Sequence, residues 1–147
     1  MLIAGTDGSE LSIEALRAGL ALLPPEEDVL LVTVVDHGDP TLVSGTGMAG
    51  GVMTEGEFQE LDAARLSEAE DVLRTTADAL GRAGTETLAL RGDAGRALCD
   101  LATDRGARAI VLGSRGRGGV KRALLGSVSD HVVRNAPCPV VITRPAE

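Results

Sequence analysis

The segment from Arg105 to Val128 combines glycines with basic side chains in a way that could hold phosphate groups. It has no acidic residue and six basic ones, namely Arg105, Arg108, Arg115, Arg117, Lys121 and Arg122. The 147-residue chain has a net charge of −8, so the rest of it carries −14. Glycines let neighbouring N–H groups converge on an anion, and Gly126-Ser127 opens a helical pattern whose dipole attracts phosphate. These features predict a polyphosphate cradle, although a long turn with solvated arginines would show the same local pattern.

Short apolar runs alternate with longer helical patterns, and these elements must position the cradle. The expected strands are Leu2–Thr6, Asp28–Val35, Glu86–Arg91, Arg108–Gly113 and Pro139–Thr143. The first expected helix follows the N-cap Ser9 and extends as far as Pro24. The second runs from the capping box of Thr54 and Glu57 to about Ala83, with Gly84 as the capping glycine. The other two span Ala94–Arg105 and Gly126–Asn135. This alternation favours a single α/β domain over residues 1–147, with an open five-stranded parallel sheet and helices on both faces.

A ligand site is expected at one edge of this sheet. In an open parallel sheet, ligands bind beyond the carboxyl ends of the strands, where the strand order reverses. If the order is 3-2-1-4-5, this point lies between the first and fourth strands. The first strand ends at Gly5-Thr6-Asp7-Gly8, and the fourth leads into the glycine segment that begins at Gly113. Asp7 is therefore a candidate binding residue, although it could instead form an Asx-type cap for the first helix.

The segment 36–53 is glycine-rich and has no periodicity, so we expect a flexible loop that could act as a lid. Within it, residues 45–50 spell GxGxxG. A dinucleotide-binding loop of this type belongs at the tight turn after the first strand of its unit, which is not where this one lies.

Composition excludes several classes of function. The acidic balance argues against a nucleic-acid partner, and one phenylalanine without tyrosine or tryptophan cannot form a base-stacking platform. No apolar run reaches the ~20 residues of a membrane span. The start shows no leader pattern, and Cys99 and Cys138 lack metal-site spacing, so we expect a reduced, cytoplasmic location.

The spacing Gly113-x2-Gly116-x9-Gly126-Ser127 resembles the G-2x-G-9x-G-S/T nucleotide loop of the universal stress protein family. The resemblance extends over nearly the whole chain, through the segments Thr6-Asp7-Gly8-Ser9, Val32-Thr33-Val34-Val35-Asp36, Gly92, and 126–141. It implies a Rossmann-like sheet of order 3-2-1-4-5 and a homodimer paired through the C-terminal strand 139–144. It also implies binding of ATP, or of ADP or AMP, with Mg²⁺ held through the phosphates.

The resemblance also implies a set of nucleotide-binding residues. Asp7 would face the nucleotide, the backbone of Val34 would meet the adenine, and the glycine loop would wrap the ribose and phosphates. The full set is Gly5, Thr6, Asp7, Val34, Gly92, Gly113, Ser114, Arg115, Gly116, Arg117, Gly118, Gly126, Ser127, Val128 and Ser129. Many family members have histidine at the position of Arg115, so this chain adds a positive charge there. Because Phe58 falls in the pattern of the second helix and is expected in the core, adenine must lie between aliphatic side chains and backbone.

Two functions from different classes remain open. The first is a nucleotide-dependent regulatory module of the stress response that acts on an unknown protein partner. The second is a slow ATPase or a self-phosphorylating protein, with Ser127 and Ser129 as possible phosphate acceptors. The first is favoured because no general base stands out. His37 could approach the site after the second strand, and His131 is expected on the polar face of the last helix.

Overall fold

The computed structural model describes residues 1–36, 53–115 and 125–144. The elements alternate in the order β1 (Leu2–Gly5), α1 (Glu10–Leu20), β2 (Val29–Val35), α2 (Glu55–Ala79), β3 (Glu86–Arg91), α3 (Ala94–Arg105), β4 (Ala109–Gly113), α4 (Ser127–Asn135) and β5 (Val140–Thr143). All neighbouring strands are parallel and the sheet order is β3-β2-β1-β4-β5, which confirms the predicted fold. His37 and the GxGxxG segment at 45–50 lie outside the described residues.

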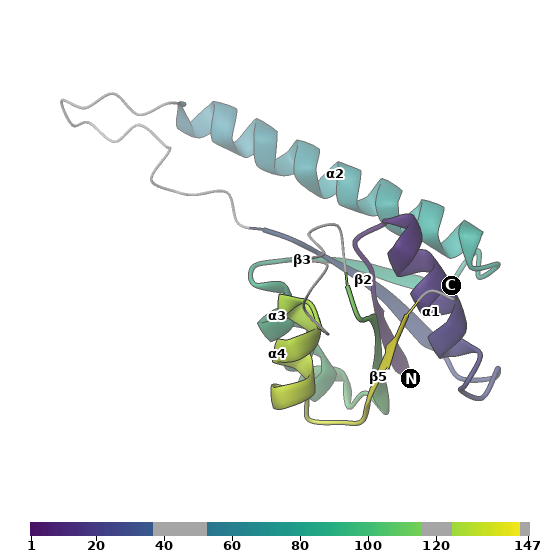
Figure 1. Cartoon of the computed structure of the whole chain (residues 1–147). Coiled ribbons are helices and arrows are strands. Elements are labelled where there is room, and N and C mark those ends of the chain that lie inside the picture. Colours follow the sequence, from purple (N-terminus) through teal and green to yellow (C-terminus); the bar gives the residue numbers. More distant parts are fainter. Residues whose placement is uncertain (37–52, 116–124, 145–147) are drawn as a thin grey trace.

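The helices form one layer on each face of the sheet, with α1 and α2 on one side and α3 and α4 on the other (Figure 1). Because side chains alternate along a strand, β1 contributes Leu2 and Ala4 to the first core and Ile3 to the second. Leu16 and Leu73 fill the first core from the helix side, and Leu98 and Val132 fill the second. The central strands are thus buried on both faces, as their continuous apolar runs predict.

Helix α2 starts as predicted but ends earlier. At its start, the backbone N–H of Thr54 donates to Glu57 Oε2 at 2.6 Å, and the backbone N–H of Glu57 donates to Thr54 Oγ1 at 3.2 Å. These hydrogen bonds lower the pKa of the Glu57 carboxyl group. The predicted end near Ala83 with Gly84 as the cap is wrong. The helix ends at Ala79 because Gly81, at φ 67°, turns the chain so that Arg82 N–H reaches the carbonyl of Ala77.

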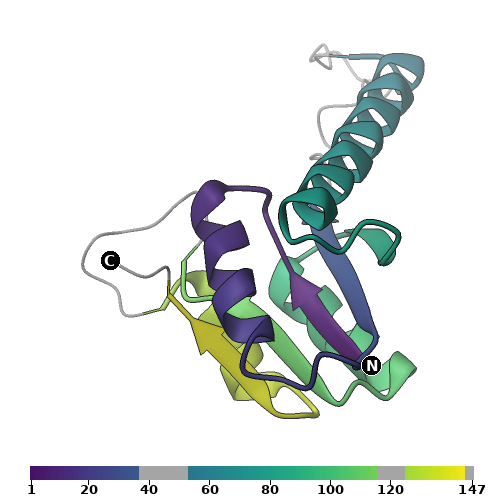
Figure 2. The same cartoon turned by 90° about the vertical axis from the view of Figure 1, so that its right-hand side faces the viewer.

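The first half of α2 extends beyond the rest of the described structure (Figure 2). Its buried residues are Ala69, Leu73, Thr76 and Ala77, which all lie in the second half. The prediction that Phe58 belongs to the core is therefore wrong, because Phe58 lies near the helix start and is only partly buried. An ion pair between Asp62 and Arg91, with Nη2 2.7 Å from Oδ2, attaches this extension to the carboxyl end of β3.

Smaller corrections concern the first two elements. β1 ends at Gly5 rather than Thr6, although Thr6 N–H still donates to the carbonyl of Val32. Helix α1 ends at Leu20, so Leu22 lies beyond it and is 74% exposed.

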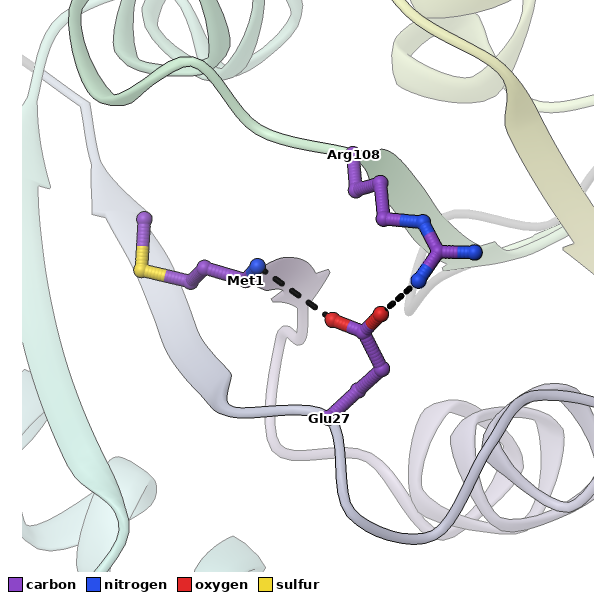
Figure 3. A network of polar contacts seen from close by, with 3 residues as sticks. All are labelled: Met1, Glu27 and Arg108. Carbon is purple, nitrogen blue, oxygen red and sulfur yellow. Dashed lines mark hydrogen bonds and ion pairs between the residues drawn. The ribbon is translucent and has the colours of Figure 1, made fainter.

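At the amino-terminal edge of the sheet, Glu27 links the residues that directly precede β1 and β4 (Figure 3). One carboxylate oxygen accepts from the amino group of Met1 at 3.3 Å, and the other pairs with the guanidinium of Arg108. The Glu27 side chain is only 15% exposed, so this pair of contacts holds a carboxylate that is largely withdrawn from water.

The two cysteines are free, with Cys99 buried in α3 and Cys138 partly buried before β5. Burial raises the pKa of both thiols, and the neighbouring Asp100 adds to the rise at Cys99. A raised pKa keeps a thiol protonated at neutral pH, where it is a poor nucleophile. This favours a structural role for Cys99 in the core.

Of the helices in the described ranges, none combines the length and apolar character that a bilayer crossing requires.

Candidate functional site

A cavity of about 660 Å³ opens at the carboxyl edge of the sheet, between the ends of β1 and β4 as predicted. Its walls come from five places: the end of β1 with Ser12 of α1, the end of β2, one face of α2, the start of α3, and the connection from β4 into α4. A cavity of this volume lies within the range of small-molecule and cofactor sites. The topology therefore places all the polar segments that the sequence singled out around one space, apart from residues outside the described ranges.

Asp7 lines this cavity and also organises the turn before α1. Its Oδ1 accepts hydrogen bonds from the backbone N–H of Ser9 at 2.9 Å and from Ser9 Oγ at 2.6 Å. Ser9 in turn caps α1 by accepting from Ser12 N–H at 3.2 Å. Asp7 therefore forms the Asx-type turn before α1 and also lies in the cavity wall. The turn fixes the carboxylate where a cation or a ligand hydroxyl in the cavity could meet it.

The backbone of Val34 faces the cavity because β2 outlasts β1. The last pair between these strands is Gly5 with Val32, and β2 continues to Val35. The carbonyl of Val35 accepts from Gly92 N–H at 3.0 Å on the β3 side. Since successive residues of a strand direct their backbone groups to opposite sides, those of Val34 point to the side that β1 has left. One donor and one acceptor on an edge of this kind can recognise the polar edge of a planar base.

The start of α4 presents backbone N–H groups to the same cavity. The first hydrogen bond within the helix runs from Asp130 N–H to the carbonyl of Gly126, so the N–H groups of Ser127, Val128 and Ser129 have no carbonyl partner inside the helix. Gly126 is the N-cap and carries no side chain to satisfy them. The side chain of Ser129 donates instead to the carbonyl of Gly113 at 2.8 Å. Free N–H groups at a helix start bind anions.

Arg115 adds a cation beside these N–H groups. It lines the cavity, and its Nε is buried without a hydrogen-bond partner within the described residues. Because Arg115 lies in the cavity wall, its positive charge favours an anion bound there. The helix start and Arg115 together form an anion-binding wall, which is the part of the predicted phosphate cradle that the structure describes.

Most of the predicted site residues gather here. Those that line the cavity are Gly5, Thr6, Asp7, Val34, Gly113, Arg115, Gly126, Ser127, Val128 and Ser129. Two do not line it. Ser114 is buried behind the wall, where its N–H donates to Thr143 at 2.7 Å and its carbonyl accepts from Gly126 at 2.8 Å. Gly92 contributes a turn at φ 119° beside Val35. Gly116, Arg117 and Gly118 lie outside the described residues.

The sequence prediction missed the wall that α2 supplies. Arg65, Glu68, Ala69 and Val72 all line the cavity, at the i, i+3, i+4 and i+7 spacing of one helix face. The spacing was visible in the sequence as a helical pattern. Nothing in it indicated that this face would lie over the end of β2, because that depends on how α2 crosses the sheet.

His131 is placed differently from its prediction. A Cβ built on Gly95 of α3 would lie 2.8 Å from three atoms of the His131 side chain, so this side chain packs against the backbone of α3. It is partly buried between the two helices rather than on a polar face, and it does not line the cavity.

The chain was compared with known proteins. Residues 1–144 match the model of the universal stress protein family. The universal stress protein YxiE of Bacillus subtilis is 32% identical over 149 aligned residues, which cover 98% of this chain and 97% of that protein. Among solved structures, UspA from Lactobacillus plantarum superposes with a TM-score of 0.70 at 20% identity, covering 97% of this chain and 96% of that one. A universal stress protein solved in complex with cAMP has a TM-score of 0.60 at 26% identity, covering 99% and 96%. The chain therefore belongs to the universal stress protein family.

Proposed function

We propose that this protein binds an adenine nucleotide, ATP with Mg²⁺ in particular, in the cavity at the carboxyl edge of the sheet. The observation that carries the proposal is the anion-binding wall, where Arg115 and the N–H groups at the start of α4, which have no backbone partner within the described residues, line one cavity. A relative of the same fold has been solved with cAMP, which is also an adenine nucleotide.

The two ends of the cavity fit the two ends of a nucleotide. The phosphates would bind at the start of α4, and the base would lie at the edge of β2, with its polar atoms on the backbone of Val34. The cavity wall includes the aliphatic side chains of Ala69, Val72 and Leu98, and no aromatic side chain lines the cavity within the described residues. Asp7, which follows the carboxyl end of β1, could meet a Mg²⁺ ion bound to the phosphates. The bound nucleotide would act as a regulatory signal toward a protein partner.

Nucleotide binding should appear as added stability. Mg²⁺–ATP at about 100 times its dissociation constant should raise the free energy of unfolding by ~2.7 kcal/mol, which thermal melts would detect. Native mass spectrometry of protein purified without added nucleotide would identify any ligand carried from the cell. GTP is the control, because it has the same phosphates and a different base edge. An unchanged melting temperature in millimolar Mg²⁺–ATP, with no bound nucleotide in the mass spectrum, would remove the proposal.

The cavity also permits the alternative of slow hydrolysis or self-phosphorylation. Ser127 is exposed and lines the cavity at the start of α4, whereas the hydroxyl of Ser129 is buried and already donates to Gly113. Ser127 is thus the better phosphate acceptor of the two. Intact-mass measurement after incubation with Mg²⁺–ATP detects self-phosphorylation, since only phosphorylation adds mass that survives denaturation. Release of inorganic phosphate from ATP detects hydrolysis.

We further propose a homodimer paired through residues 139–144. β5 is an edge strand, and within the described residues it pairs only with β4. The carbonyl of Pro139 accepts from Ile110 of β4 and that of Thr143 accepts from Ser114, just after β4, so by alternation the backbone groups of Ile142 point outward. Light scattering should give twice the 15.0 kDa chain mass, and Ile142→Pro, which removes an outward N–H, should shift it toward one chain while circular dichroism stays helical. A single-chain mass of the unsubstituted protein at high concentration would contradict the dimer.

A further inference from the structure

The α2 wall of the cavity has an apolar end and a polar end. Ala69 and Val72 form the apolar end, nearest the turn after β1, where Val72 packs against Gly8. Arg65 and Glu68 form the polar end, one helical turn earlier. This stripe faces the edge of β2, because α2 packs on β2 and β3.

Arg65 is partly buried, and its guanidinium has no anionic partner among the described residues. One turn before it, Asp62 forms two hydrogen bonds to Arg91, at 3.2 Å to Nε and 2.7 Å to Nη2. That pair fixes the helix at the end of β3 and occupies the carboxylate that could otherwise reach Arg65. Glu68, one turn after it, forms no ion pair with Arg65 within the described structure.

The charges of this wall fit a base better than phosphates. Glu68 lies on the same face, and a carboxylate repels phosphate. The phosphate-binding groups lie on another wall, at the start of α4 and at Arg115. Arg65 instead lies one helical turn after Asp62, whose carboxylate contacts Arg91 at the end of β3, next to the strand that carries Val34. A guanidinium is planar, and its plane stacks on the faces of aromatic rings and bases.

We propose that Arg65 covers the face of the bound base and determines affinity for it, in the place of an aromatic side chain. This inference rests on the proposed nucleotide site. The guanidinium would pack on one face of the ring, and the other face would lie toward Ala94 and Leu98 of α3, which line the opposite wall. Stacking by arginine needs the planar group, whereas pairing with phosphate needs mainly the charge, so the two roles can be separated.

The test compares Arg65→Ala and Arg65→Lys, with AMP and Mg²⁺–ATP as ligands in calorimetric titrations. Arg74→Ala is the matched control, because Arg74 lies on α2, is exposed, and pairs with Asp71 outside the cavity. We expect both Arg65 variants to bind AMP and ATP about tenfold more weakly, by a similar factor for each, and Arg74→Ala to bind as the unsubstituted protein does. Circular dichroism and Tm confirm that all variants are folded.

Three results would overturn the inference. They are full affinity in Arg65→Ala, restored affinity in Arg65→Lys, and a loss confined to ATP, which would assign Arg65 to the phosphates. Each requires that the unsubstituted protein binds nucleotide. If the unsubstituted protein binds neither AMP nor ATP, the proposed function itself fails, and the inference fails with it.

Discussion

Gly126→Asp should give a protein that is at least as stable as the original chain but no longer binds ATP. Gly126 is the N-cap of α4, at φ −75° and ψ 167°, a conformation open to any residue. A Cβ there would lie 3.5 Å from the carbonyl oxygen of Ser114, which is ordinary contact. Aspartate is a favoured N-cap and lies at the positive end of the helix dipole, so the fold should gain from a few tenths to about 1 kcal/mol.

The same carboxylate should prevent phosphate binding. It would accept from the N–H groups of Val128 or Ser129, which the proposed site offers to the ligand, and it would repel the phosphates. Two unit charges ~5 Å apart at an effective dielectric constant of ~20 repel by about 3 kcal/mol, which is roughly a hundredfold in affinity.

Two neutral variants separate the causes. Gly126→Asn caps the helix without charge and should lose part of the affinity, whereas Gly126→Ala neither caps nor repels and should keep most of it. Urea titrations give the stability of each variant, and thermal shifts with Mg²⁺–ATP give the binding. If Gly126→Asp binds ATP as well as Gly126→Ala does, the phosphates do not lie at the start of α4.

Gly8→Ala should destabilise the fold by about 2–5 kcal/mol and disturb the cavity wall. Gly8 has φ +75°, where a residue with a Cβ costs ~1–2 kcal/mol. The new Cβ would lie 2.6 Å from Cγ1 of Val72, so α2 would have to shift away from the turn after β1. Overpacking of this kind adds roughly 1–3 kcal/mol.

Val72→Ala provides the matched test of that clash. Alone it should cost about 1 kcal/mol, since it removes two methyl groups from a partly buried side chain. In the Gly8→Ala background it should cost less, or should stabilise, because it removes the atoms that the new Cβ meets. The cost of a positive φ at residue 8 would remain. Urea denaturation of the unsubstituted protein, the two single variants and the double variant gives the coupling free energy between residues 8 and 72. Strictly additive changes in the free energy of unfolding would show that the new Cβ does not clash with Val72.

The fold was predictable from the chain because the determining patterns are local. Continuous β-branched runs, the Thr54–Glu57 capping box and the glycines after α2 and α3 set the order of elements, and right-handed crossovers leave few ways to arrange them. The errors fall where two local signals compete. Gly81 and Gly84 both have positive φ, and the sequence does not say which one ends α2. Phe58 follows the helical pattern, yet it lies on the half of α2 that extends beyond the sheet.

The glycine loop, the basic window, the family resemblance and the chain segments that carry Asp7 and Gly113 can all be read from residue type and spacing, which folding does not change. The placement of Arg65 in the cavity wall, the strand edge that leaves the Val34 backbone open, and the burial of Ser114 behind the wall depend instead on the tertiary structure. The reason is physical. A helix face or a backbone edge acquires a role only when long-range packing sets the angle at which α2 crosses the sheet and the length by which β2 outlasts β1.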